Sequence, residues 1–183
     1  MVNCFDEIEK DYHELRDFIL NDLSLLLNSP KGGNYATTLI IATACEVLGP
    51  VRFQNNGEKE FFKNYLIPEK WKPVAFSIYD ALRNGLAHSF SPKSLMQING
   101  TTLEVGLSWK EKPHFSYDQA SSVIHINVAQ LAASLEKAFN IYENELRTNN
   151  ELCSRYKTKR NKKRVTNIQN QKEKSEWLKL IKP

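Results

Sequence analysis

The sequence predicts a mainly α protein, a bundle of about five helices with a small β-hairpin insertion before the last long helix. Apolar residues recur at spacings of three and four over 6–27 and 128–146, as is typical of amphipathic helices. Between these segments, apolar residues alternate on both sides of Asn99-Gly100, which indicates a hairpin. Hydrophobic residues make up 41% of the 183 residues, enough for a core. We therefore expect one domain over 1–150 and a C-terminal tail over 151–183.

The helices are bounded by proline and glycine. The first is expected over 6–27 and the second over 35–48, where Gly49-Pro50 would close it. Because the second is nearly apolar all round, it should lie at the centre of the bundle. A short third helix over 58–66 stops at Pro68, and a fourth begins after Pro73.

The spacing of apolar residues changes after the fourth helix, which Ser91-Pro92 prevents from continuing. Residues 95–98 and 101–109 flank Asn99-Gly100, the dipeptide that best tolerates a type I′ turn. A further short strand is expected over 123–127, and the β insertion as a whole at about 94–126. The last long helix follows it.

Charge is distributed unevenly along the chain. The net charge is +4, but residues 155–183 hold 11 basic and 2 acidic residues, a net of +9, which leaves −5 for residues 1–154. Such an asymmetry is expected of a chain with an arm that seeks polyanions, although basic C-termini are often only solvated. Residues 172–182 are expected to form a short helix with Trp177 on its apolar side, which would need a docking partner.

The cysteines and the hydropathy suggest a compartment. Cys4, Cys45 and Cys153 stand far apart with no CxxC pair, so we expect neither a disulfide scaffold nor a zinc knuckle, as suits a reducing compartment. No apolar run reaches the roughly 18 residues that a membrane span needs. The first residues are acidic, unlike those of a signal peptide. We expect a cytoplasmic protein with no membrane contact.

The most informative segment runs over 78–93. It places Arg83, Asn84 and His88 at the C-terminal end of a helix, with Gly85 weakening the last turn. An arginine and a histidine at this spacing are weak evidence alone, because such pairs arise by chance in a chain of this size. The surrounding residues have to supply the specificity.

This segment resembles the HEPN superfamily of small helical-bundle proteins, whose mark is Arg-x4–6-His, often with a polar residue directly after the arginine. Here the mark is Arg83-Asn84-Gly85-Leu86-Ala87-His88, with an aromatic-apolar helix before it and Pro92-Lys93 after it. The resemblance covers about 35–147. It implies a two-fold dimer that is either a metal-independent endoribonuclease, of a stress, toxin or phage-defence kind, or a module that only binds RNA, nucleotides or a partner protein. Carried over, Arg83 and His88 are the catalytic pair and Asn84 is an accessory polar group.

The residue types suit RNA cleavage. RNA carries its own nucleophile, the 2′-hydroxyl, so an enzyme needs only proton transfer and charge stabilisation. A histidine titrates near neutrality, and an arginine stays charged and presents a fork of donors to phosphate oxygens. We expect 2′,3′-cyclic phosphate and 5′-hydroxyl products and no cofactor.

Regular helix geometry separates the pair. Five residues turn through about 500°, which leaves Arg83 and His88 some 140° apart and roughly 7.5 Å along the axis. Either the helix breaks at Gly85, or the site combines residues of two chains across a dimer axis. The structural alternative is that Arg83 forms a salt bridge and His88 only favours the helix C-terminus.

Glu46 is expected on the inner face of the second helix, where an unpaired carboxylate is costly. A basic partner is therefore expected, either Arg83 or Arg52. The pair could orient the Arg83 guanidinium for catalysis or serve only as structure.

The expected partners are single-stranded RNA, a second copy of the chain, and a cognate antitoxin or other partner protein. We expect phosphate contacts from eight basic residues: Lys93, Arg155, Lys157, Lys159, Arg160, Lys162, Lys163 and Arg164. A rival reading makes the tail an assembly element that docks through the Trp177 segment.

The remaining candidates are weaker. His13, expected to be solvated, and His114 and His125 lack helical metal-ligand spacing, so we expect no metal site. Trp71, Trp109 and Tyr117 could stack on unpaired bases, although such tryptophans more often lie at the rim of a core.

Overall fold

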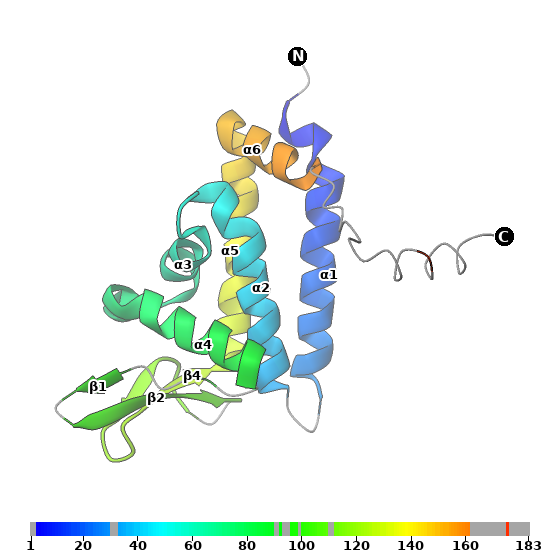
Figure 1. The fold of residues 1–183 in the computed structure, drawn as a ribbon. Helices are drawn as coiled ribbons and strands as arrows, with labels where there is room; N and C mark the ends of the chain where they lie inside the picture. Colours follow the sequence, from blue (N-terminus) through cyan, green and yellow to red (C-terminus); the bar gives the residue numbers. More distant parts are fainter. Residues whose placement is uncertain are drawn as a thin grey trace.

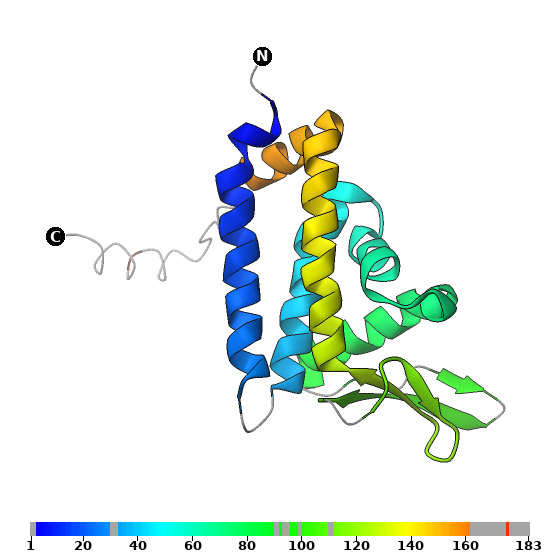
Figure 2. The ribbon, with the colours of Figure 1, turned by 180° about the vertical axis from the view of Figure 1, so that it is seen from behind.

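Three long helices form the body of the molecule. The computed structural model describes residues 3–29, 33–89, 92, 96–98, 100–109, 112–161 and 175. In it α1 (Glu9–Leu27), α2 (Asn34–Arg52) and α5 (Val128–Thr148) stand side by side (Figures 1 and 2). The short helix α4 (Ala75–Ser89) crosses their lower end, and a small sheet lies beneath it (Figure 1). The mainly α fold with a β insertion before the last long helix of the bundle is confirmed.

Shorter turns complete the helical part. The turn η1 (Phe5–Glu7) precedes α1, and η3 (Glu69–Val74) leads into α4. The predicted third helix consists of α3 (Gly57–Phe61) and the wider π-helical turn η2 (Phe62–Leu66). At the opposite end of the bundle from the sheet, α6 (Asn150–Asn161) lies across the tops of the long helices (Figure 1).

The prediction that Gly49-Pro50 closes the second helix is wrong, because α2 continues to Arg52. A proline supplies no N–H and crowds the preceding turn, so carbonyls there need other donors. Side chains also donate into this turn, from Tyr142 to the Leu48 carbonyl at 3.2 Å and from Lys159 to the Val47 carbonyl at 3.4 Å, beside the Glu46 carbonyl whose helical donor Pro50 lacks.

Gly49 and Gly57 allow α2 and α3 to touch through their backbones. A Cβ placed on Gly57 would lie 2.4 Å from Pro50 Cα, and one on Gly49 would lie 2.2 Å from the Gly57 carbonyl oxygen. No real Cβ atom sits so close to backbone. Gly49 therefore serves close packing, and not the helix end that its position beside a proline suggests.

The β insertion is a four-stranded sheet with the order β1-β2-β4-β3. Strands β1 (Met96–Ile98) and β2 (Thr101–Ser108) form the predicted hairpin around Gly100, whose φ is +79°. The predicted strand β4 (Val123–Asn127) pairs in parallel with β2, and β3 (Ser116–Asp118), which we did not predict, pairs antiparallel with β4.

Buried tyrosines tie the long helices together. The Tyr12 hydroxyl of α1 donates to the Phe139 carbonyl of α5 at 2.6 Å, and the Tyr79 hydroxyl of α4 donates to the Ala42 carbonyl of α2 at 3.2 Å. Burial raises the pKa of Tyr12 and that of Tyr79 far above the usual range of a phenol. These hydroxyls therefore remain protonated donors.

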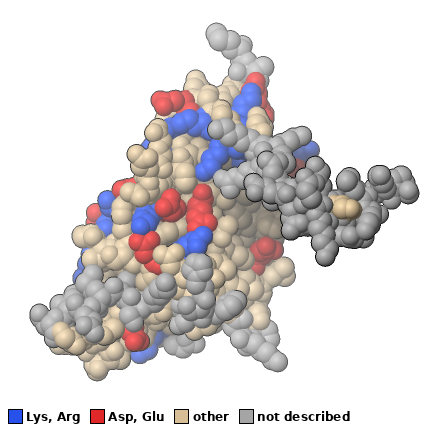
Figure 3. All heavy atoms as spheres, in the orientation of Figure 1, with Lys and Arg blue, Asp and Glu red and all other residues tan. Residues whose placement is uncertain are grey.

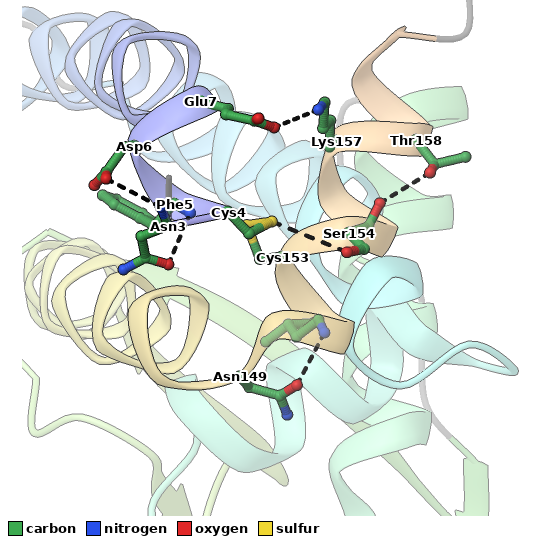
Figure 4. The surroundings of a disulfide bond; sticks show 11 residues. Asn3, Cys4, Phe5, Asp6, Glu7, Asn149, Cys153, Ser154, Lys157 and Thr158 are labelled. Atoms are coloured by element: carbon green, nitrogen blue, oxygen red, sulfur yellow. Dashed lines mark hydrogen bonds and ion pairs between the residues drawn. A yellow bond between two sulfur atoms is a disulfide. The ribbon is translucent and has the colours of Figure 1, made fainter. Parts of the chain in front are cut away.

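The first part of the predicted tail belongs to the bundle. Leu152, Cys153 and Tyr156 of α6 are buried, and a disulfide joins Cys153 to Cys4 beside η1 (Figure 4). The sequence analysis expected no disulfide scaffold, yet one disulfide forms, because residues far apart in sequence meet where η1 and α6 lie side by side (Figure 4). This removes the cysteine argument for a reducing compartment. The predicted short helix over 172–182 falls outside the described residues, apart from Ser175.

Among the described helices, none taken singly has the length and apolar character of a membrane span. The pair formed by α2 and the α3–η2 segment meets that description only when its two parts are joined across a bend of 103°.

Candidate functional site

Arg83 projects from α4 toward α2. Its Nε donates a hydrogen bond to Glu46 Oε1 at 2.5 Å, and the two side chains are 36% and 37% exposed. This hydrogen bond and the negative charge of Glu46 raise the pKa of the Arg83 guanidinium above its usual value. Arg83 is thus a permanent cation, held in one orientation at a surface that solvent reaches. The predicted basic partner of Glu46 is Arg83, whereas Arg52 binds Glu145.

His88 lies five residues after Arg83 on the same helix. The break at Gly85 that would bring the two together is absent, because α4 is helical throughout Ala75–Ser89 and Gly85 is buried within it. The backbone positions of Arg83 and His88 are therefore about 140° apart around the axis. Asn84 is partly buried beside Arg83. The side chain of His88 lies outside the part of the chain that the structure describes.

A shallow groove extends from Glu46 to α6. It has a volume of about 410 Å³, and Glu46, Tyr156, Lys159 and Arg160 contribute to its lining. The groove joins the Arg83–Glu46 pair to the basic side chains of α6 along the surface of α2. On the face shown in Figure 3, however, basic and acidic side chains interleave.

Two of the predicted RNA-binding cations hold α6 in place. Lys157 forms an ion pair with Glu7, and Arg160 binds Asp11 through Nε at 2.9 Å and a terminal nitrogen at 3.1 Å (Figure 4 shows the first pair). The Arg160 hydrogen bond holds the pKa of Asp11 below its usual range, against the opposing effect of burial.

The other predicted cations divide into two groups. Arg155 and Lys159 lie on α6 and line a second groove of about 590 Å³ beside Pro50 and Val51. Lys93, Lys162, Lys163 and Arg164 fall outside the described residues.

The sequence analysis missed the carboxylates that neutralise α6. The signal was present, because an acidic first helix and a basic tail have complementary charges. The tail's charge alone is compatible with an external polyanion, with solvation or with assembly, and its internal carboxylate partners become visible only in the fold.

We predicted that His13 would be solvated. It is instead half-buried, and its Nε2 lies 3.3 Å from Glu143 Oε1. Glu9, His13 and Glu143 each place one ligand atom within 4.8 Å of the others, so the described residues do contain a grouping of metal-ligating type. Arg147 already bridges Glu9 and Glu143, at 2.6 Å and 2.8 Å. Burial opposes ionisation of Glu143, but hydrogen bonds from Arg147 and His13 hold its pKa below the usual range. Arginines thus balance these carboxylates.

Two further histidines lie in the β insertion. Burial lowers the pKa of His114 to about 4, so this ring is neutral near pH 7. His125 Nε2 lies 3.9 Å from Asp118 Oδ2 on the opposite side of the sheet from Tyr117. Both histidines follow α4 in the sequence and belong to the strands and loops of the β insertion.

Comparison of the chain with protein-family models, with curated proteins and with solved structures finds no match in any of the three.

Proposed function

We propose that the chain is a metal-independent endoribonuclease of HEPN type that acts on single-stranded RNA as a homodimer. The observation that carries the proposal is the Arg83–Glu46 pair, which holds a permanent cation in a fixed orientation at an accessible surface. His88 follows it at the spacing that the HEPN mark requires.

In the proposed reaction, the 2′-oxygen of RNA attacks the adjacent phosphorus and the 5′-oxygen of the next nucleotide leaves. The His88 imidazole takes the 2′ proton, and the imidazolium that results gives a proton to the leaving oxygen. Arg83 donates to the non-bridging oxygens, whose negative charge grows in the transition state. The products are a 2′,3′-cyclic phosphate and a 5′-hydroxyl, so every proton and electron pair is accounted for without a metal.

A dimer supplies what one chain lacks. Because α4 is continuous, Arg83 and His88 of one chain diverge. A two-fold axis beside α4 would set Arg83 of each chain opposite His88 of the other, giving two sites per dimer with one arginine and one imidazole each. In a stress, toxin or phage-defence setting, a cognate antitoxin would act by covering this composite site.

The second candidate is a non-catalytic module that binds RNA, nucleotides or a partner protein. It is favoured by the same divergence of Arg83 and His88, together with the neutralisation of Arg83 by Glu46. This module would need Arg83 as a phosphate contact but would not need His88.

The test is cleavage of single-stranded RNA by the full chain in EDTA. We expect Arg83→Ala to lower the rate about 10²-fold or more and His88→Ala about 10²–10⁴-fold. Glu46→Gln should lower kcat more than it raises KM, because it would loosen Arg83 without removing it. Arg52→Ala is the matched control, since Arg52 Nε binds Glu145 at 2.8 Å with similar exposure of both side chains, and it should retain full activity.

Mixing the two inactive variants tests the composite site. If each site uses Arg83 of one chain and His88 of the other, an equal mixture of Arg83→Ala and His88→Ala recovers about a quarter of the wild-type rate, because half of the random dimers hold one intact site. No recovery would rule out the shared site. RNA binding without cleavage, unchanged in His88→Ala, would favour the binding module.

A further inference from the structure

We propose that a groove between η3 and the sheet is a binding site for a nucleobase of single-stranded RNA, separate from Arg83 and His88. The groove has a volume of about 720 Å³, within the range of about 300–1,000 Å³ that is usual for small-ligand sites. Trp71 and Val74 of η3 line one side, and Tyr117 and Ile124 of the sheet line the other. RNA as the source of the base rests on the proposed function.

The sheet presents an aromatic ring to solvent in this groove. Tyr117 of β3 pairs with Ile124 of β4, so the two side chains share one face of the sheet. Ile124 is buried, but Tyr117 is 48% exposed, and Val74 across the groove is 43% exposed. An apolar groove with an open aromatic wall gains most from a flat ligand that can lie against the ring.

The opposite wall is aromatic and fixed. The Trp71 ring is partly buried and lies 6.1 Å from the ring of Phe115, which belongs to the core. Lys70 Nζ lies 6.0 Å from the Trp71 ring centroid and brings a positive charge to the rim. A base in the groove would thus find one rigid wall, one exposed stacking ring and a cation near its phosphate.

The remaining lining favours a base over an apolar peptide. Gln119, Thr101 and Ser122 add an amide and hydroxyls, which can both donate to and accept from the edge of a base. Among the described residues that line the groove, none is a carboxylate and one is a lysine. This balance suits a polyanion and would leave polar groups unmatched against an aliphatic peptide.

The groove and Arg83 lie apart on the η3–α4 segment. Val74 precedes Arg83 by nine residues, which corresponds to roughly 13 Å along the helix axis and about 180° around it. Arg83 faces Glu46 of α2, whereas the groove lies between η3 and the sheet, which Figure 1 shows beneath α4. A strand with its scissile phosphate at Arg83 would therefore have to pass around α4 to place a base several nucleotides away in the groove.

The experiment measures binding and not cleavage. A fluorescein-labelled 2′-O-methyl oligouridylate cannot be cut, because its 2′-oxygen is blocked, and its anisotropy reports the dissociation constant for the full chain. We expect Tyr117→Ala to weaken binding about tenfold and Tyr117→Phe, which keeps the ring, to bind like the wild type. Tyr35→Ala is the matched control, because Tyr35 is also 48% exposed but lies at the start of α2, and its affinity should be unchanged.

The outcomes separate this inference from the proposed function. Equal affinity of Tyr117→Ala and wild type would overturn the base site even if the wild type cleaves RNA. Tyr117-dependent binding by a protein that cleaves nothing would uphold the base site and reject the ribonuclease. Loss of affinity in Tyr117→Phe as well as in Tyr117→Ala would also overturn it, since the contact would then depend on the hydroxyl and not on stacking.

Discussion

The Arg83–Glu46 ion pair orients a side chain of the candidate site more than it stabilises the fold. The Arg83–Glu46 pair is over one-third exposed on both sides, and ion pairs of that kind contribute about 0–1 kcal/mol to folding. Its consequence is geometric, since it selects one rotamer of a long side chain. The sequence predicted a basic partner for Glu46, either Arg83 or Arg52, because a carboxylate on an apolar helix needs a cation nearby, and the structure selects Arg83.

A residue whose protonation opposes folding is His114. Its pKa is about 4 in the folded chain against 6.5 for an ordinary histidine, so the unfolded chain binds the proton first as the pH falls. Stability should therefore be full above about pH 6.5 and decline by about 3 kcal/mol toward pH 4. Urea unfolding of wild type and His114→Gln at several pH values checks this, and an equal decline in both proteins would contradict it.

At the scale of elements, the long helices and the hairpin could be predicted because apolar residues repeat regularly along each of them. The misreadings have physical causes. Gly49-Pro50 predicts a helix end, but the glycine is required for close packing with α3, and side chains of α5 and α6 donate to carbonyls of the turn before the proline. Strand β3 is only three residues long and depends on pairing with β4, so no local sequence pattern predicts it.

The contact of α2 with α3 makes a sharp prediction for Gly57. Its backbone adopts no left-handed conformation, so Gly57→Ala would be harmless but for the 2.4 Å approach to Pro50 Cα. Because backbone cannot rotate away as a side chain can, we expect a loss of about 3 kcal/mol or more in the free energy of unfolding.

Urea denaturation gives this value, and Thr43→Ala, on an exposed position of α2, serves as the control within about 0.5 kcal/mol. A stable Gly57→Ala protein would mean that α3 can shift away from α2.

At the scale of the whole molecule, opposite charges at the two ends of the described chain meet on one surface. The acidic residues Glu7 and Asp11 hold the basic residues Lys157 and Arg160 of α6. The distribution of charge along the sequence showed that the tail is basic but not what its cations bind, since they suit either an external phosphate or an internal carboxylate. Only the folded arrangement tells which of them are already engaged.

The disulfide also holds α6 against the N-terminal region. Cys4 and Cys153 are separated by 149 residues, and closing a loop of that size stabilises the fold by about 5 kcal/mol in the chain-entropy model. We expect dithiothreitol to lower the urea midpoint of the wild type and to leave that of Cys4→Ser unchanged. If dithiothreitol left the urea midpoint of the wild type unchanged, the ion pairs alone would hold α6 in place.

The candidate site was less predictable from the sequence than the fold. The Arg83–His88 spacing and Glu46 could be selected from residue types, but whether the two functional groups converge depends on helix continuity and on a second chain. The groove at Tyr117 joins a turn before α4 to strands that follow it, so it has no contiguous sequence pattern.

The cross-link between Cys4 and Cys153 also changes the topology of the chain, which becomes a closed loop with a free C-terminal segment. A protease that cuts once inside the loop, for example at the exposed turn of Gly100, would create new termini without releasing a fragment. The product would be two chains held together by the disulfide, running as one species on a non-reducing gel until a reductant separates it into two.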